Sequence, residues 1–188
     1  MLKICGGEWK GQLIKAPSGN ETRPTSAYLR ESIFNTLVNG MAHEPQRVLD
    51  IFAGTGALGL EALSHGAESA IFIEASPKTL KILEANVGKL AKNRQTRILK
   101  EGDLLRWATL VQKETVFTPF DTVFCDPPYG KKLIEKSLRA LDIDTLWAQG
   151  ALWIAEMGIE EDVGHPKWER IKEKLHGDSK VVILRRLK

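Results

Sequence analysis

A run of four residues, Asp126-Pro127-Pro128-Tyr129, carries the sharpest chemical signal in the sequence. It follows residues 120–125, an apolar segment typical of a buried strand. Two consecutive prolines remove two backbone donors and stiffen the chain, so this corner presents acceptors only: the Asp126 carboxylate and the Pro127 carbonyl. Tyr129 adds a flat ring on which a nucleobase can stack, a contact worth about 1–3 kcal/mol per base.

These groups suit methylation of an exocyclic amino group of a base. Such a nitrogen is conjugated to the ring and is a poor nucleophile. Two acceptors that hold its hydrogens favour a pyramidal nitrogen, whose lone pair can attack a sulfonium methyl group in line, so positioning and electrostatics carry the catalysis. The methylated amine is a strong acid and can lose its proton to Asp126 or to water. The alternative is that residues 126–129 form an ordinary turn at the end of a strand. That alternative is disfavoured, because the turn would have to occur by chance together with the glycine turn upstream.

A second segment has the pattern of a nucleotide-binding turn. Residues 48–59 contain G-x-G-x-x-G at Gly54, Gly56 and Gly59, between a predicted strand and a predicted helix. The glycines allow a tight turn and let a ligand lie against the backbone. Glu74 ends the next predicted strand, where a carboxylate can accept hydrogen bonds from both ribose hydroxyls; capping of the following helix is its alternative role.

Two further carboxylates bear on the kind of ligand. Asp50 lies just before the glycine turn, where it would repel a pyrophosphate but would suit a ligand with an ammonium and a sulfonium. Asp103 follows the third predicted strand and can accept from an adenine amino group, although a helix N-cap would explain it equally well. Three carboxylates on successive strand ends favour a cationic nucleoside over a dinucleotide.

The segments that position these motifs alternate between strand and helix patterns. This alternation predicts an α/β fold with a mostly parallel sheet, whose ligands bind beyond the carboxyl ends of the strands. The last two strands are too close for a helical crossover and should pair antiparallel, giving a seven-stranded sheet with an antiparallel C-terminal strand. The predicted strands cover residues 48–52, 70–73, 97–99, 120–125, 151–155, 168–175 and 180–187, with helices over 26–38, 58–63, 77–87, 104–111 and 132–141.

The charge distribution bears on the partner. The net charge is +3 over residues 1–30, −5 over 31–165 and +5 over 166–188. Basic ends suit a polyanion such as nucleic acid, although two solvated basic surfaces would look the same. The first residues are rich in glycine, lysine and turn formers. We therefore expect a small hairpin or loop extension at residues 1–24 that contacts RNA, ahead of one catalytic domain at 25–188.

Composition excludes several classes of protein. The chain has 188 residues, 43% of them hydrophobic, which suits one compact domain. No apolar run approaches the roughly 18 residues of a membrane helix, and the start lacks the apolar region of a signal peptide. The two cysteines form no C-x-x-C pair and the four histidines are scattered. We therefore expect a cytoplasmic protein with no membrane segment and no metal site.

Taken together, the motifs resemble a known family. The glycine turn followed by Asp-Pro-Pro-Tyr is similar to class I amino-methyltransferases of nucleic acids. The N-terminal segments narrow the resemblance to the bacterial 16S rRNA (guanine-N2) methyltransferase family called RsmD. These segments are Gly6-Gly7, Trp9-Lys10-Gly11, Thr22-Arg23-Pro24-Thr25, Arg30-Glu31-Ser32-Ile33-Phe34-Asn35 and the long form of the turn over residues 49–64. The resemblance runs nearly end to end.

The resemblance implies a Rossmann-like class I methyltransferase fold and S-adenosylmethionine as the cofactor. It implies that the cofactor is bound by Asp50, Phe52, Ala53, Gly54, Gly56, Glu74 and Asp103. A flipped guanine would be held by the catalytic residues Asp126, Pro127, Pro128 and Tyr129, where some members of the family carry Phe in place of the tyrosine. Residues expected near the cofactor or the RNA are Lys10, Arg23, Thr25, Arg30 and Asn35. The implied partner is 16S rRNA, within the 30S subunit or an assembly intermediate.

Three other functions share part of the pattern. A DNA adenine-N6 methyltransferase would use the same Asp-Pro-Pro-Tyr corner, but the predicted elements leave no sizeable inserted region for recognising a DNA target. A NAD-dependent oxidoreductase would use the same glycine turn, but nothing in the sequence resembles a hydride-transfer site. A non-catalytic RNA-binding protein with a vestigial turn would not need the intact corner at residues 126–129.

Overall fold

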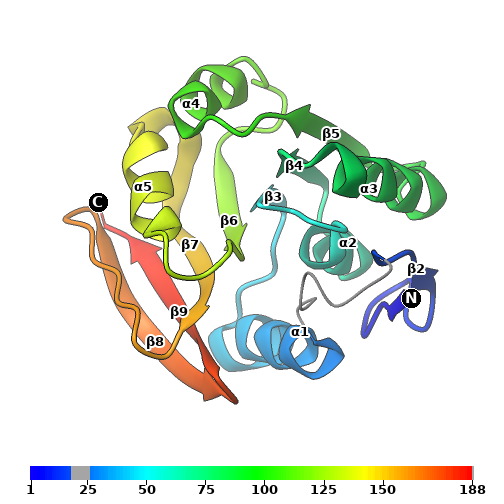
Figure 1. Cartoon of the computed structure of the whole chain (residues 1–188), viewed down its shortest axis with the longest axis horizontal. Coiled ribbons are helices and arrows are strands. Elements are labelled where there is room, and N and C mark those ends of the chain that lie inside the picture. Colours follow the sequence, from blue (N-terminus) through cyan, green and yellow to red (C-terminus); the bar gives the residue numbers. More distant parts are fainter. Residues whose placement is uncertain (18–25, 188) are drawn as a thin grey trace.

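The computed structural model describes residues 1–17 and 26–187, which form a central sheet with helices on both faces (Figure 1). The helices are α1 Ala27–Phe34, its π-helical continuation η1 Asn35–Gly40, α2 Ala57–Ser64, α3 Pro77–Leu90, α4 Leu104–Gln112, α5 Leu133–Ala140 and the short 3-10 turn η2 Asp144–Leu146. The strands are β1 Leu2–Lys3, β2 Leu13–Ile14, β3 Arg47–Ile51, β4 Ser69–Glu74, β5 Gln95–Lys100, β6 Phe120–Cys125, β7 Trp147–Gly158, β8 Trp168–His176 and β9 Ser179–Arg186.

The central sheet has seven strands in the order β5-β4-β3-β6-β7-β9-β8. The first five run parallel to one another, and the C-terminal strand β9 pairs antiparallel with both β7 and β8. The predicted mostly parallel, seven-stranded sheet with an antiparallel C-terminal strand is confirmed. Parallel strands require helical crossovers, which explains the alternation of strands and helices along the sequence.

Two apolar cores lie on opposite faces of the sheet. Alternate residues of a strand point to opposite faces, so Val48 of β3 enters one core while Leu49 and Ile51 enter the other. The first core includes side chains of α1, α2 and α3, and the second includes those of α4 and α5. None of the helices in the described part of the chain combines the length and apolar character needed to cross a membrane.

Helices α1 and α3 each begin after a serine that caps the first turn. Ser26 caps α1 by accepting a hydrogen bond from the Leu29 amide at 3.1 Å. Ser76 caps α3 in the same way, and Pro77 occupies the first turn, where its missing N–H costs nothing. These caps fix where α1 and α3 start relative to the carboxyl edge of the parallel strands.

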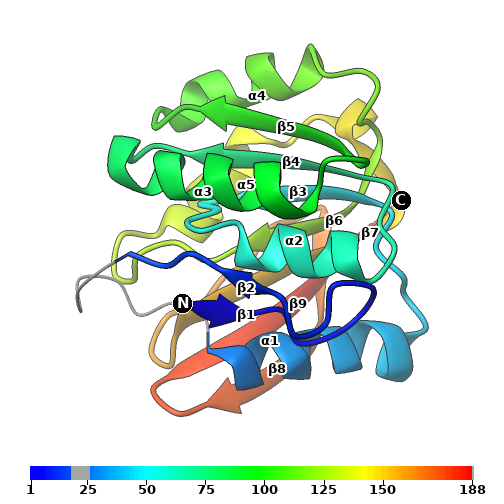
Figure 2. The same ribbon diagram turned by 90° about the vertical axis from the view of Figure 1, so that its right-hand side faces the viewer.

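The described part of the predicted N-terminal extension, residues 1–17, packs onto the fold. Figure 2 shows β1 and β2 between α2 and α1. Ile4 and Ile14 are buried in the first core. The Glu61 carboxylate of α2 accepts hydrogen bonds from the backbone amides of Cys5 at 2.9 Å and Gly6 at 2.7 Å. This segment therefore contributes to the hydrophobic core, and its predicted role in RNA contact stays a prediction.

Candidate active site

The glycine turn and the Asp-Pro-Pro-Tyr corner leave neighbouring strands at the same edge of the sheet. Strands β3 and β6 pair in parallel with Asp50 beside Phe124 and Ile51 beside Cys125. Neighbouring strands lie about 4.8 Å apart, so the residues that follow, Phe52 and Asp126, begin their turns side by side. The two motifs found separately in the sequence therefore border one site beyond the carboxyl ends of the parallel strands.

Glycine is required at the three positions of the turn for different structural reasons. A Cβ atom at Gly56 would lie 2.5 Å from Leu83, and one at Gly59 would lie 2.4 Å from the Phe72 ring. These two glycines let the turn press against α3 and β4. Gly54 has a φ of +57°, and its added Cβ would meet nothing closer than 3.9 Å. The side of the turn at Gly54 therefore leaves room for a ligand against the backbone.

Phe52 starts the turn in an unusual conformation. Its φ is +59°, in the left-handed region that non-glycine residues rarely adopt. Its half-buried ring packs edge-on against Trp107 of α4, with centroids 5.0 Å apart. The next residue, Ala53, donates its amide to the Ile73 carbonyl of β4 at 3.0 Å. These contacts hold the beginning of the turn between β4 and α4.

Glu74, at the end of β4, braces the glycine turn. One carboxylate oxygen accepts the Gly54 amide at 2.8 Å, and the other accepts the Ser76 amide at 2.7 Å. Each carboxylate oxygen has two lone-pair sites, so both can still accept a hydroxyl from a ligand. The predicted ribose contact is compatible with this geometry and stays a prediction.

Asp50 lies beneath the turn and sets the electrostatics of the site. Its side chain is 2% exposed, and one oxygen accepts the Gly59 amide at 2.9 Å. Burial raises the pKa of the Asp50 carboxyl well above its usual value, and the charges of Asp126 and Glu74 raise it further against the opposing effect of the Gly59 hydrogen bond. Asp126 and Glu74 thus place negative charge around the buried Asp50 carboxyl, which a pyrophosphate would worsen and a cationic ligand would relieve.

Asp103 has the geometry of a helix cap. Its carboxylate accepts the Leu105 amide at 3.0 Å at the start of α4. The neighbouring Glu101 accepts the Asp103 amide at 2.9 Å and forms an ion pair with Arg106 at 3.2 Å. The capping role weighed in the sequence is therefore present, and the exposed Asp103 carboxylate keeps acceptor capacity for an adenine amino group.

The Asp-Pro-Pro-Tyr corner is braced from the next strand. Pro127 is buried, Asp126 is half-buried and the Tyr129 side chain is 47% exposed. The Tyr129 hydroxyl donates to Glu156 Oε1 at 2.9 Å, and the Ser179 hydroxyl donates to the same oxygen at 3.0 Å. Burial, and next the Glu156 charge, raise the pKa of Tyr129 to about 12. The phenol therefore stays protonated at neutral pH.

Of the residues predicted near the cofactor or the RNA, the structure describes Lys10, Arg30 and Asn35. Arg30 is fully buried, donates to the Lys3 carbonyl at 2.7 Å and lies 3.6 Å from Glu61. This side chain has no surface from which to contact RNA, so the structure corrects the predicted role of Arg30 to a structural one. Asn35 lies at the start of η1 in a surface groove. Arg23 and Thr25 fall outside the described residues.

Lys10 lies away from the glycine turn. The amides of Glu8 and Trp9 donate to the backbone and side-chain oxygens of Ser64, at 2.7 and 2.9 Å. Ser64 is the last residue of α2, a helix about 12 Å long whose other end follows the turn. The structure therefore places Lys10 at the opposite end of α2 from the predicted cofactor residues.

Two residues of the site were missed in the sequence. Glu156 follows the apolar core of β7, so the rule that ligands lie beyond strand ends could have identified it. Asn86 lies inside α3, and its amide nitrogen donates to the Thr55 carbonyl at 2.9 Å and to the Lys15 carbonyl at 3.0 Å. Asn86 thus ties the glycine turn to the N-terminal segment, a role that helical periodicity alone does not reveal.

The residues present fit a cationic nucleoside. The space at Gly54, the two acceptors of Glu74 and the carboxylates that surround Asp50 together match a ribose and a positively charged tail. Within the described part of the chain, no group of three or more His, Cys, Asp or Glu side chains is placed to hold a metal ion. The site therefore suits S-adenosylmethionine, with the Asp-Pro-Pro-Tyr corner beside it. That the glycine turn and Glu74 hold the cofactor stays a prediction.

Comparison with known proteins agrees with this geometry. The family model described as "Conserved hypothetical protein 95" matches residues 2–185. The chain belongs to this family, the RsmD family. It is 34% identical to ribosomal RNA small subunit methyltransferase D from Escherichia coli K12, over 94% of this chain and 85% of the relative. The predicted membership of the RsmD family is confirmed.

One further sequence relative and one solved structure support the assignment to the RsmD family. An uncharacterized methylase from Rickettsia prowazekii is 30% identical over 98% of both chains. The solved structure of yhhF from Escherichia coli, described as a candidate methyltransferase, superposes with a TM-score of 0.79 at 29% identity and covers 99% of this chain and 98% of that one. The Rossmann-like methyltransferase fold expected from the resemblance is confirmed.

Proposed function

We propose that the protein transfers a methyl group from S-adenosylmethionine to the exocyclic N2 of a guanine in 16S rRNA. The observation that carries the proposal is the pairing of β3 with β6, which sets the Asp126 corner beside the glycine turn. The Escherichia coli relative is named a ribosomal RNA small subunit methyltransferase, which supports rRNA as the substrate. We further propose a cytoplasmic enzyme that acts on the 30S subunit or an assembly intermediate.

The residues of the corner prepare the amino group for transfer. The Asp126 carboxylate and the Pro127 carbonyl accept its two hydrogens, which orients the nitrogen lone pair toward the glycine turn. Tyr129 stacks on the flipped base, and its own hydroxyl is held by Glu156. After transfer the amine has gained a methyl group and a positive charge, and it loses one proton to Asp126 or to water.

The residues of the turn orient the donor. S-adenosylmethionine, when bound, supplies an electrophilic methyl group on a sulfonium. Glu74 is suited to accept the ribose hydroxyls and Asp103 the adenine amino group. The carboxylates around Asp50 attract the cationic end, whose charge would in turn favour ionisation of Asp50. Because these groups are fixed before binding, they cost little reorganisation during the reaction.

The identity of the base is the part that the corner alone leaves open. An acceptor pair of this kind can hold an adenine N6 amine as well as a guanine N2 amine. The name of the Escherichia coli relative supports rRNA over DNA as the substrate. Guanine N2 is proposed because the sequence motifs resemble those of the RsmD family. The negative field under the glycine turn also argues against a dinucleotide cofactor and hence against the oxidoreductase alternative.

The test uses a methyl donor whose methyl group carries deuterium. The full chain is incubated with this donor and either 30S particles, naked 16S rRNA or duplex DNA, all from cells that lack the corresponding gene. Nucleosides are then analysed by mass spectrometry. We expect labelled N2-methylguanosine from an rRNA sample. Labelled N6-methyladenine from the DNA, or no labelled guanine from any rRNA sample, would overturn the proposal.

A further inference from the structure

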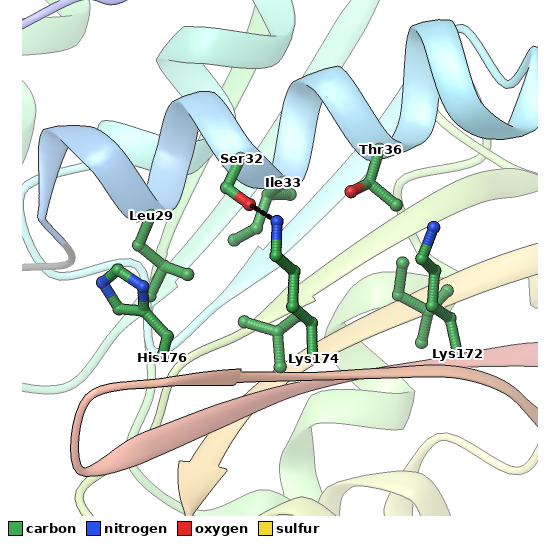
Figure 3. A pocket seen from close by; sticks show the side chains of 9 residues that line it. Leu29, Ser32, Ile33, Thr36, Lys172, Lys174 and His176 are labelled. Atoms are coloured by element: carbon green, nitrogen blue, oxygen red, sulfur yellow. Dashed lines mark hydrogen bonds between the residues drawn. The ribbon is translucent and has the colours of Figure 1, made fainter.

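A polar groove lies between the α1–η1 helix and the edge strand β8. It adjoins the smaller pocket drawn in Figure 3, with which it shares Ser32, Lys172 and Lys174. Its volume is about 560 Å³. The helix side includes Tyr28, Asn35 and Thr36, and the strand side is formed by Lys172 and Lys174. A smaller apolar recess next to it has room for about one water molecule, at 20 Å³. The groove is therefore an open channel rather than a closed pocket for a small molecule.

The strand side of the groove is a row of basic residues. Lys172, Lys174 and His176 alternate along β8, so their side chains point to the same face, toward α1. The Lys174 ammonium donates to the Ser32 hydroxyl at 2.8 Å. Glu31 also lines the groove, but among the described residues no ion pair joins it to either lysine. Within the described residues, both lysines therefore lack an ion-pair partner and face the groove.

The end of the groove nearest the active site presents an aromatic ring. Tyr28 stacks on His176 with ring centroids 5.2 Å apart and an interplanar angle of 17°. The Tyr28 side chain is nevertheless 65% exposed. A flat exposed ring beside a row of cations is the combination with which proteins hold single-stranded nucleic acid.

A chain of contacts connects this end of the groove to the catalytic corner. The Ser179 hydroxyl lies 3.2 Å from the His176 carbonyl and 3.0 Å from Glu156 Oε1, and Glu156 in turn accepts the Tyr129 hydroxyl. The hairpin between β8 and β9 thus borders both places. A strand that enters the corner with one base can continue past this hairpin into the groove.

We propose that the groove binds the RNA strand that flanks the target base. Lys172 and Lys174 contact successive phosphates, Tyr28 stacks with a flanking base, and Asn35 and Thr36 face the sugars. This inference rests on the proposed function, because it takes RNA as the substrate. Lysines on an edge strand also discourage strand-to-strand aggregation, but that role requires neither the exposed ring nor the groove.

The test compares two double variants of the full chain that remove the same charge. Lys172→Ala/Lys174→Ala removes the groove lysines. Lys92→Ala/Lys113→Ala removes two exposed lysines that follow α3 and α4, at the opposite edge of the sheet. Binding to fluorescein-labelled 16S rRNA transcript is measured by anisotropy over a series of salt concentrations. Affinity for S-adenosylmethionine, measured by calorimetry, checks that each variant is folded.

We expect the groove variant to bind RNA at least tenfold more weakly at low salt. Each phosphate contact to a single strand contributes about 0.7 to the slope of log affinity against log salt, so the loss of two lowers its magnitude by about 1.4. The control variant should keep the wild-type slope. A groove variant with the wild-type slope, or a control with an equal loss, would overturn the proposal.

The stacking role of the Tyr28 ring is tested with a matched pair of variants. Tyr28→Phe keeps the stacking face, and Tyr28→Ala removes it. We expect about a fivefold or larger loss of RNA affinity in the alanine variant only. Equal affinity of the two variants contradicts the stacking role.

The proposed function is scored separately by labelled N2-methylguanosine from the wild type. If that product forms while the groove variant binds RNA normally, the groove proposal alone fails. If the product is absent, the proposed function fails, and the RNA-binding slopes still decide the role of the groove.

Discussion

The hydroxyl of Tyr129 donates a hydrogen bond of 2.9 Å to Glu156 Oε1, which joins the corner after β6 to the end of β7. Ser179, at the start of β9, donates to the same oxygen. Three strand ends therefore converge on the edge of one aromatic ring. Because the exposed ring would otherwise be free to rotate, this contact fixes the plane on which a base can stack.

Replacement of Tyr129 separates stacking from positioning. We expect Tyr129→Ala to raise the KM for rRNA at least tenfold, because a stacked base contributes about 1–3 kcal/mol. Tyr129→Phe keeps the ring and loses only the hydrogen bond to Glu156, so its KM should rise by no more than about threefold. Steady-state kinetics with radiolabelled donor measure both. A phenylalanine variant as impaired as the alanine variant would contradict the stacking role.

Asp50 should make the stability of the free protein depend on pH. Its pKa is raised above the ordinary value of 3.8, so in the folded state it binds a proton more tightly than in the unfolded state. The folded protein therefore loses stability as the pH rises from about 4 through the raised pKa. We expect Asp50→Asn to remove this loss while weakening S-adenosylmethionine binding.

Urea unfolding between pH 4 and pH 8 measures this effect. The stability of Asp50→Asn relative to the wild type should grow with pH and then level off. A difference between the two proteins that stays constant, or that shrinks as the pH rises, would show that the Asp50 carboxylate is not destabilised by its surroundings.

Alanine substitutions at two glycines of the turn should have different effects, one on stability and the other on cofactor binding. An added Cβ at Gly59 would lie 2.4 Å from the Phe72 ring, so Gly59→Ala should cost about 1–3 kcal/mol of stability by overpacking. Gly54→Ala has open space around it and should cost only about 1–2 kcal/mol for its left-handed backbone. We expect Gly54→Ala to lose at least tenfold in S-adenosylmethionine affinity, because its methyl group occupies the ligand side. Calorimetry and urea unfolding distinguish the two; normal cofactor binding by Gly54→Ala would place the ligand elsewhere.

The buried pair Arg30–Glu61 should matter for stability and not for RNA. Arg30→Met leaves the Glu61 carboxylate buried without its cation, which costs about 3–5 kcal/mol. Addition of Glu61→Gln should recover part of this loss. Thermal and urea unfolding provide the measurement. A stable Arg30→Met protein with a reduced salt slope for RNA binding would restore the RNA contact that the sequence suggested.

The sheet and both motifs could be predicted because they depend on local signals. The predicted strand over 48–52 is a short apolar run, the glycine turn has a recognisable spacing, and two successive prolines at 127 and 128 indicate a rigid corner. Their adjacency is a different matter, because β3 pairs with β6 although β4 and β5 lie between them in the sequence. The predicted α/β fold itself needed no long-range information.

The role of individual polar residues could not be predicted in the same way. The resemblance suggested a role for Arg30 near the cofactor or the RNA, but the side chain is buried against the Lys3 carbonyl and Glu61. Glu156 and Asn86 act across 27 and 31 residues of sequence, on Tyr129 and Thr55. Such contacts depend on which side chains tertiary packing brings together, and no local pattern specifies them.

The central claim is that the corner at residues 126–129 acts on an amine beside the donor held by the glycine turn. The most direct measurement is single-turnover methylation of 16S rRNA by Asp126→Asn, together with calorimetric titration of S-adenosylmethionine. Because Asp126 holds the amine directly and reaches the donor only through its charge, we expect the rate to fall about 10²–10³-fold while donor affinity falls far less, by about threefold at most. Methylation at the wild-type rate by Asp126→Asn would contradict the account.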